Sequence, residues 1–385
     1  MNDAAIGGEQ DARRAAVTRG SSGQGPKRVL LVAEHLRRAV PGGIGVYVAG
    51  LLHGLNELAR EGLVVPDVTL YASRARHSPD PLSSFGLPVV SSRLSAVVLT
   101  RAWDRSILHV PTGYDVVHAT SLAVPPLRRG TAIVTIHDLA WRRVPDAYPG
   151  RGRRWHEAAL QRALRRASCF VVPSTGVADD LIAAGAPAGA TTVIPHGSDH
   201  LPPPDEFAAL ALLERLGVED EFLLSVGTLE PRKNLARLFE AYRAARSSLP
   251  GPWPLVVVGP TGWGPGAPPH EGVVFTGAVP AEVLAGIYAR ARMLVYVPLV
   301  EGFGLPPVEA MRLGTPVVAS RLPSTGGAAL EVDPGSIRDI ADAIAKVASD
   351  DAVRRDLALR GEAHARSLTW KAAARTHVRL WDMVR

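Results

Sequence analysis

Short apolar runs alternate along this chain with segments in which apolar residues recur at helical spacing. In the first half, six runs predict buried strands: RVLLVAEH (28–35), DVTLYA (67–72), DVVHA (115–119), AIVTIHDL (132–139), CFVVPS (169–174) and TTVIPHG (191–197). In the second half, five more predict strands: FLLSVGT (222–228), PLVVVGP (254–260), VVFTGAV (273–279), MLVYVPL (293–299) and PVVAS (316–320). Apolar strands that alternate with helices are typical of parallel sheets covered by helices on both faces. The pattern predicts an α/β fold with a doubly wound parallel sheet in each half.

The helical segments carry the apolar stripes that such a fold needs. After the first strand, Tyr47, Leu51, Leu55 and Leu58 share one helical face,. Further helices are predicted at about residues 234–248, 281–291 and 306–313,.

The stretch HGSDHLPPPDEF (196–207) is rich in Gly and Pro, which indicates a linker between two domains,. We therefore expect four parts: a flexible tail (1–26), a first Rossmann-like domain (27–199), a second Rossmann-like domain (200–366) and a last helix (367–385). That helix can either cap the second domain or cross back to the first. The two domains are expected to face a cleft at the carboxyl ends of their strands, where ligands bind in open α/β sheets.

Composition excludes several classes of protein. The 385 residues, 46% hydrophobic and 21% charged, suit a globular protein of two domains,. No apolar run approaches the ~18 residues of a membrane-spanning helix, and residues 1–26 lack the apolar core of a signal peptide,. A cytoplasmic location is therefore expected. The single cysteine, Cys169, rules out an internal disulfide framework,.

Positive charge is concentrated in the first half, where 23 Lys and Arg face 16 Asp and Glu within residues 1–200. It is densest in RGRRWHEAALQRALRRA (151–167), with six arginines and one glutamate. A solvated helix face explains this stretch, and so does contact with an anionic membrane surface or a phosphorylated acceptor. No nucleic-acid-binding motif is present, so nucleic acid is not expected as a partner.

Two glycine-containing turns follow predicted strands. PGGIGVYVAGLL (41–52) places glycines before a helix, where backbone N–H groups can approach an anion, although a plain tight turn has the same pattern,. SVGTLEPRKNLARLFEAY (225–242) places Arg232 and Lys233 between a strand and a helix, with Asn234 as a candidate N-cap,. Two cations at a strand's carboxyl end suit a diphosphate, whereas an exposed basic turn is the alternative.

Two further strand ends carry candidate chemistry. VEGFGLPPVEAM (300–311) places Glu301 at a strand end and Glu309 in the first turns of a helix that a proline begins,. Such a carboxylate is also favoured by the helix dipole alone. TIHDLAW (135–141) places His137 and Asp138 at another strand end, as a simple hydrogen-bonded pair or as a sugar-binding or catalytic site,. No metal-ligand spacing, P-loop or G-x-S-x-G motif is present,.

Taken together, GGIGVY, TIHDLAW, VIPHG, VGTLEPRKN and EGFGLPPVEAMRLGTPVVAS resemble, in this order, a retaining glycosyltransferase of family 4, group 1, with the GT-B fold. The resemblance covers about residues 27–385 and is strongest to the mannosyltransferase-like branch of polysaccharide assembly. It implies an acceptor domain (27–199), a donor domain (200–366) and a C-terminal helix that crosses back to the first domain. It also implies catalysis without a metal or other cofactor.

The resemblance assigns roles to individual residues. It implies catalytic roles for His137 at the transferred sugar, for Arg232 and Lys233 at the leaving diphosphate, and for Glu301 at the sugar. The implied donor-binding residues are Gly43, Gly45, Gly227, Arg232, Lys233, Gly302, Phe303, Gly304, Leu305 and Glu309, with Glu309 at the ribose. The segment SRLPSTGGAALEVDP (320–334) departs from the branch, because it is shorter and lacks a glutamate usual there.

The predicted function is transfer of a hexose from a nucleoside-diphosphate sugar to a lipid-linked or glycan acceptor, with GDP-mannose as the favoured donor. UDP-hexoses and deoxysugar nucleotides remain alternatives as donors. Because a lipid-linked acceptor lies in a membrane, we expect peripheral contact of the protein with the inner face of that membrane. A related two-domain enzyme, such as an epimerase or hydrolase, is a second hypothesis. A catalytically silent sugar- or lipid-binding partner is a third.

Overall fold

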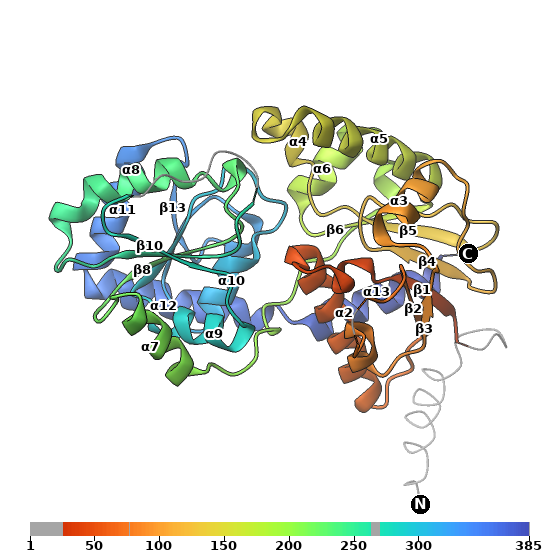
Figure 1. The fold of residues 1–385 in the computed structure, drawn as a ribbon, viewed down its shortest axis with the longest axis horizontal. Coiled ribbons are helices and arrows are strands. Elements are labelled where there is room, and N and C mark those ends of the chain that lie inside the picture. The colour runs from red at the N-terminus through yellow and green to blue at the C-terminus, as the bar shows by residue number, and fades with distance from the viewer. Residues whose placement is uncertain (1–25, 77, 263–269, 385) are drawn as a thin grey trace, which may run out of the picture.

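The computed structural model describes residues 26–76, 78–262 and 270–384 and contains two parallel β-sheets (Figure 1). The predicted tail, residues 1–26, lies almost wholly outside the described residues. The strands of the first sheet are β1 (Arg28–Val32), β2 (Asp67–Ala72), β3 (Val89–Ser91), β4 (Val116–Ala119), β5 (Thr131–Thr135), β6 (Cys169–Val172) and β7 (Thr191–Val193). Those of the second are β8 (Leu223–Val226), β9 (Leu255–Val258), β10 (Val273–Gly277), β11 (Met293–Tyr296), β12 (Val317–Ser320) and β13 (Leu330–Val332).

Both sheets are doubly wound. The first has the order β3-β2-β1-β4-β5-β6-β7 and the second the order β10-β9-β8-β11-β12-β13, with every neighbouring pair parallel. The strand order reverses between β1 and β4 in the first sheet and between β8 and β11 in the second. These are the points at which open α/β sheets bind ligands. The predicted α/β fold with two Rossmann-like domains is thereby confirmed.

Helices cover both faces of each sheet (Figure 1). In the first domain they are α2 (Gly42–Arg60), α3 (Ala96–Asp104), α4 (Ala140–Arg143), α5 (Gly150–Arg166) and α6 (Thr175–Ala183). The next are α7 (Glu206–Arg215), α8 (Leu235–Ala245), α9 (Ala281–Arg290), α10 (Leu305–Arg312), α11 (Ile337–Ser349), α12 (Asp351–Ser367) and α13 (Trp370–Met383). The short 3-10 helices are η1 (Glu34–Arg37), η2 (Pro81–Phe85), η3 (Pro145–Ala147), η4 (Ala188–Ala190), η5 (Pro231–Lys233), η6 (Arg246–Ser248) and η7 (Pro323–Thr325).

Long apolar runs predicted their elements well, and short ones did not. The helices predicted at about 234–248, 281–291 and 306–313 correspond to α8 with η6, to α9 and to α10. The three-residue edge strands β3 and β13 were missed, because they carry no recognisable period, whereas the equally short β7 lies within the predicted run TTVIPHG,. The predicted domain boundary near residue 200 falls between β7 and β8. Along the chain, β7 is the last strand of the first sheet and β8 is the first strand of the second.

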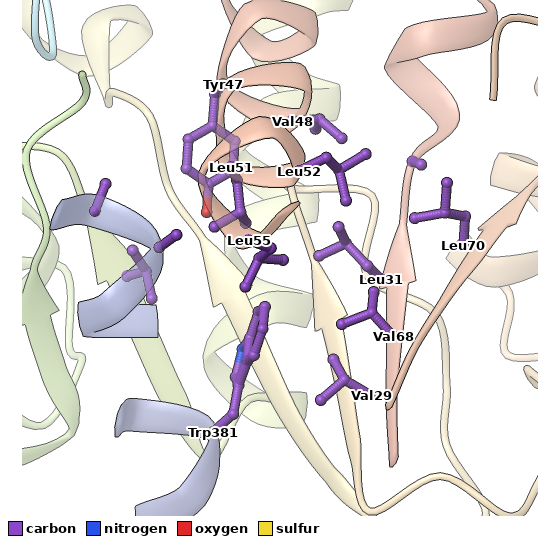
Figure 2. Close-up of a cluster of buried hydrophobic side chains, with 14 of the residues drawn as sticks. Val29, Leu31, Tyr47, Val48, Leu51, Leu52, Leu55, Val68, Leu70 and Trp381 are labelled. Atoms are coloured by element: carbon purple, nitrogen blue, oxygen red, sulfur yellow. The ribbon is translucent and has the colours of Figure 1, made fainter. Parts of the chain in front are cut away.

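The chain passes from α12 in the second domain to α13, which packs against α2 of the first (Figure 1). Figure 2 shows Trp381 of α13 in the same apolar cluster as Leu51 and Leu55 of α2. At Gly54 of α2, a Cβ atom would overlap the backbone of Trp370, so the two helices approach as closely as glycine allows,. Residues 370–383 therefore belong to the core of the first domain.

A buried chain of hydrogen bonds fastens α13 in place. From donor to acceptor it runs through Trp381, His118, Thr135, Tyr47, His377 and the carbonyl oxygen of Ala373, with distances of 2.8–3.3 Å. The direction follows from His377, whose Nδ1 lies 2.8 Å from a carbonyl and must carry the proton,. Its Nε2 then accepts from the Tyr47 hydroxyl. The network begins and ends on α13 and passes through β4, β5 and α2.

Acid should weaken this attachment through His377. Burial lowers the pKa of His377 from 6.5 to about 4, so the unfolded chain binds a proton at a higher pH than the folded protein does,. The stabilisation is fully present above pH 6.5 and is lost as the pH falls toward 4, with a total on the order of 3 kcal/mol. In urea unfolding at pH 7.5 and pH 4.5, wild type should lose more stability than His377→Gln. Equal losses would contradict this role; the exposed His53→Gln serves as control.

Candidate active site

The loops after β5 and β11 bring the two domains into backbone contact. Gly302 follows β11, and a Cβ atom there would overlap the carbonyl oxygen of His137, which follows β5. The hydroxyl of Ser174, at the start of α6, donates to the carbonyl oxygen of Gly302 at 2.7 Å. The candidate site therefore lies where the carboxyl ends of both sheets meet.

Arg232 and Lys233, on the 3-10 helix η5 after β8, converge on one carboxylate. The Lys233 ammonium lies 2.6 Å and the Arg232 guanidinium 2.8 Å from Oε1 of Glu301. The hydroxyl of Tyr296, the last residue of β11, lies 2.9 Å from the same oxygen and 2.7 Å from Lys233 Nζ. All three charged side chains are only 10–14% exposed.

A second carboxylate completes this charge cluster. Glu230 accepts two hydrogen bonds from Arg232, at 2.7 and 3.1 Å, and lies one residue before η5. Although burial opposes ionisation, Lys233 and Arg232 hold the pKa of Glu301 at about 2. Two buried cations are thus balanced by two carboxylates. An entering anion can bind Arg232 and Lys233 only by competing with Glu301, which binds both side chains.

His137 is held by one of its two ring nitrogens, and among the described residues no hydrogen bond engages the other. Its Nε2 lies 2.9 Å from the carbonyl oxygen of Thr120 and therefore carries the proton, which leaves Nδ1 as an acceptor,. Burial lowers the pKa of His137, so the ring is neutral at pH 7,. It packs edge-on against Tyr47, with ring centroids 4.9 Å apart. A neutral acceptor of this kind suits a substrate hydroxyl and does not act as a general acid.

The structure places Gly43 and Gly45 inside the first turn of α2, whereas the sequence predicted them between strand and helix. Gly43 is exposed and faces Leu305, which begins α10 in the other domain; a Cβ at Gly43 would lie 3.9 Å from Leu305 Cδ1. Gly45 is buried. In the part of the chain that the structure describes, no side chain caps α2, so its first N–H groups can donate to an anion,.

Glu309 lies in α10 as predicted, but its carboxylate is only 8% exposed. Oε2 accepts from the Tyr288 hydroxyl at 2.7 Å and Oε1 from His200 Nε2 at 2.9 Å. Each carboxylate oxygen can accept a further hydrogen bond, so these contacts leave room for one more donor. The role of Glu309 at a ribose stays a prediction.

The remaining predicted donor-binding residues surround the cluster. Gly227 follows β8 with φ +149° and lies beside the Lys233 side chain, where a Cβ would be 3.4 Å from Cε. Phe303 is buried, with its ring centroid 4.9 Å from that of His196. Gly304 has φ +94° and immediately precedes α10, a backbone conformation that favours glycine,.

Sequence reasoning missed Glu230, Tyr296, Ser174 and His200. For Tyr296 a signal existed, since a phenol at the end of an otherwise apolar strand needs a partner,. Ser174 and His200 act across long sequence separations, for which the chain carries no local signal. Asn234 is the N-cap residue of α8, as predicted, but its side chain makes no capping hydrogen bond; its amide donates to the carbonyl oxygens of Val297 and Pro334.

Within residues 26–76, 78–262 and 270–384, no group of three His, Cys, Asp or Glu side chains could hold a metal ion. In the same part of the chain, no helix has the length and apolar character needed to cross a membrane.

The chain is similar to known glycosyltransferases in both of its halves. Residues 41–200 match the family described as Glycosyltransferase Family 4, and residues 214–364 match that described as Glycosyl transferases group 1. The chain is 32% identical over 263 residues to the O-antigen chain mannosyltransferase B of Escherichia coli, covering 64% of this chain and 68% of that protein. It is 29% identical over 181 residues to the serotype-specific mannosyltransferase WbdA of Escherichia coli, covering 43% of this chain and 22% of that protein. Anabaena Alr3699/HepE, solved with UDP and glucose, superposes with a TM-score of 0.68 at 18% identity, over 93% of this chain and 100% of that one, which shows a shared fold.

Gly302→Ala should separate the domains, because the added methyl group cannot occupy the position of the His137 carbonyl oxygen. We expect a larger radius of gyration by small-angle X-ray scattering than for wild type. Gly152→Ala, where a Cβ would meet nothing within 4 Å, is the matched control and should scatter like wild type. An unchanged radius for Gly302→Ala would show that the backbone contact does not set the domain arrangement.

Proposed function

Since the chain belongs to the family 4, group 1 glycosyltransferases with the GT-B fold, we propose that it transfers mannose from GDP-mannose with retention of anomeric configuration. The acceptor is a glycan, carried on a lipid. The observation that carries this proposal is the Arg232, Lys233 and Glu301 cluster at the switch point of the second sheet. Two cations at that position suit the diphosphate of a nucleotide sugar.

In the proposed reaction, Arg232 and Lys233 bind the diphosphate and stabilise the negative charge that grows on it as the glycosidic bond breaks. They supply this charge from the protein itself, so the reaction needs no metal ion or other cofactor. The acceptor hydroxyl attacks the anomeric carbon on the face that the diphosphate leaves. It loses its proton to that diphosphate, so the configuration is retained without a protein nucleophile.

The remaining residues orient the donor. Nδ1 of His137 accepts a hydrogen bond from a sugar hydroxyl, and the backbone N–H groups of residues 302–304 donate to others. Glu301, displaced from the cations by the diphosphate, accepts from the sugar, and Glu309 accepts from the ribose. Gly43, Gly45 and Gly227 allow the backbone to approach the phosphates.

Support for mannose comes from the two similar mannosyltransferases, and support for a nucleotide from the cation pair. UDP-sugars or deoxysugar nucleotides are the second choice, since a protein with the same fold binds UDP.

GDP should raise the Tm of the protein more than UDP does, because binding to the folded state stabilises it by mass action. A larger rise in Tm with UDP would show that the donor carries uracil and not guanine.

Three substitutions separate binding from chemistry. Lys233→Ala should lower kcat roughly 100-fold or more, because it removes charge from the leaving group. Glu309→Ala should mainly raise the KM for the donor, and Glu301→Ala should mainly lower kcat. Release of GDP from GDP-mannose in the presence of a glycan acceptor measures all three. Glu362→Ala, which alters a carboxylate paired on the surface of α12, is the matched control.

The outcomes distinguish the competing functions. Unchanged turnover in both Lys233→Ala and Glu309→Ala would defeat the assignment. A transferase consumes acceptor and releases GDP in equal amounts, whereas an epimerase or hydrolase acts on the sugar nucleotide alone. An anomeric product of inverted configuration, identified by NMR, would refute retention.

We also propose peripheral contact with an anionic membrane through α5. Arg151, Arg153 and Arg154 are exposed in its first turns, whereas Arg162 is paired with Asp104. Flotation with anionic vesicles should recover more protein at low salt than at high salt, where surface charges are screened. Arg153→Ala/Arg154→Ala should bind less than Arg338→Ala/Arg355→Ala, which alters the second domain. No binding at any ionic strength would leave α5 as a solvated helix face.

A further inference from the structure

A small basic pocket lies in the first domain, apart from the Arg232 and Lys233 cluster. Its volume is about 230 Å³, and it is lined by residues that follow β1 and β2 and by Ala96, the first residue of α3. It therefore opens at the carboxyl edge of the first sheet, the edge that also carries His137. Another cavity, of about 510 Å³, lies in the second domain and includes Phe222, which precedes β8 and so lies at the amino edge of the second sheet.

The wall of the pocket is held rigidly by two acid groups and one arginine. Glu34 accepts hydrogen bonds from the backbone N–H and the hydroxyl of Ser73, at 2.6 and 2.9 Å. Arg37 donates to the carbonyl oxygen of Ser73 and forms an ion pair with Asp80. All three polar groups of Ser73 are thereby fixed, and β2 is tied to η1. The pocket is formed in advance of any ligand.

Three further arginines line the pocket: Arg38, Arg74 and Arg76. Among the described residues, none of their side chains has a hydrogen-bond or ion-pair partner, in contrast to Arg232, which is held by two carboxylates. With Arg37 included, four guanidinium groups face the two carboxylates of Glu34 and Asp80. The pocket keeps an excess of positive charge that would be satisfied by an anion.

The backbone adds to this preference. Ser95 precedes α3, and among the described residues no side-chain hydrogen bond caps the helix, so its first N–H groups can donate to an anion,. A helix N-terminus favours negative charge. Arginine side chains and a helix N-terminus together suit the tetrahedral oxygens of a phosphate, which accept several hydrogen bonds at once.

Exposed apolar residues adjoin the pocket lining in sequence. Val40 is 54% exposed and follows Ala39 in the pocket wall, while Val97 and Val98 are 57% and 47% exposed and follow Ala96. They belong to two separate segments that each contribute to the pocket. A hydrocarbon chain attached to a bound phosphate could cover them, whereas a fully polar ligand would leave them in water.

The pocket also adjoins the proposed site of transfer. His35 follows Glu34, and burial lowers its pKa to about 3, with the charges of Arg38 and His137 contributing in the same direction. His35 is therefore close to both a pocket arginine and the histidine at the domain interface.

We propose that the basic pocket binds the phosphate of a lipid-linked acceptor, with the hydrocarbon chain on Val40, Val97 and Val98. The glycan on that phosphate extends toward His137. This inference rests on the proposed function, because it names the acceptor class of the same reaction. It assigns recognition to Arg38, Arg74 and Arg76, whereas the sequence had directed attention to the arginines of α5.

A direct binding measurement tests the pocket independently of transfer. The full-length protein is titrated by calorimetry with dodecyl phosphate, dodecyl maltoside and inorganic phosphate, each detergent below its micellar concentration. Dodecyl phosphate should bind at least ten-fold more tightly than either of the others. Arg74→Ala/Arg76→Ala should lose most of this binding, and because both side chains are exposed without partners among the described residues, its thermal unfolding should match wild type.

The matched control is Arg128→Ala/Arg129→Ala. These arginines are exposed in the same domain but precede β5, so they lie at the opposite edge of the sheet. This control should bind dodecyl phosphate like wild type. If both double variants lost dodecyl phosphate binding equally, the binding would depend on the net charge of the domain and not on this pocket. Equal binding of inorganic phosphate would remove the lipid from the proposal, and equal binding of dodecyl maltoside would remove the phosphate.

Transfer assays then connect the pocket to the reaction. With a glycan on a long-chain alkyl phosphate, Arg74→Ala/Arg76→Ala should raise the KM for the acceptor at least ten-fold and leave the KM for the donor unchanged. The same glycan on a phosphate-free alkyl chain should show no difference between variant and wild type. An unchanged acceptor KM would overturn the inference while leaving the transferase intact. A wild-type protein that transfers to no acceptor but binds dodecyl phosphate would instead count against the proposed function.

Discussion

The two domains meet backbone to backbone, and the rest of the site is arranged around that contact. Gly302 lies against the carbonyl of His137, and Ser174 binds the carbonyl of Gly302 from a third element. Gly302 lies in the loop after β11 and His137 in the loop after β5, so the contact brings the carboxyl ends of the two sheets together. Residues from both domains then face one space between them. No side chain larger than hydrogen fits at residue 302, so the geometry is specified by the absence of a side chain.

Charge compensation is the second constraint on this space. Buried cations are stable only with a counter-charge, and Glu301 and Glu230 supply it to Arg232 and Lys233,. The cations are thus kept in position before any ligand arrives. A ligand diphosphate would exchange one counter-charge for another without burying unpaired charge. In the basic pocket of the first domain the opposite holds, since Arg38, Arg74 and Arg76 form no ion pair among the described residues, although the charge of Glu34 acts on Arg38.

Sequence patterns predicted the architecture because fully buried parallel strands leave a strong apolar signal. Glycine and proline mark where strands and helices begin and end, and they predicted the positions of Arg232, Lys233, Glu301 and Glu309 at such ends. The partners of these residues did not follow. Glu301 binds Lys233 over 68 positions, and Glu309 binds His200 over 109 positions. Such pairs depend on how two sheets are set against each other, which no local spacing encodes. The same reason hid the basic pocket, whose arginines come from two separate strand ends.

The attachment of α13 has a consequence for the way the protein is made. Its tryptophans fill the core of the first domain, beside α2, yet they follow the whole second domain in the chain. At a translation rate of roughly 5 to 20 residues per second, the ribosome needs roughly ten to forty seconds to pass from β7 to α13. During that time the apolar face of α2 has no permanent cover. The nascent first domain must remain soluble while incomplete, and its folding finishes only after the second domain has been synthesised.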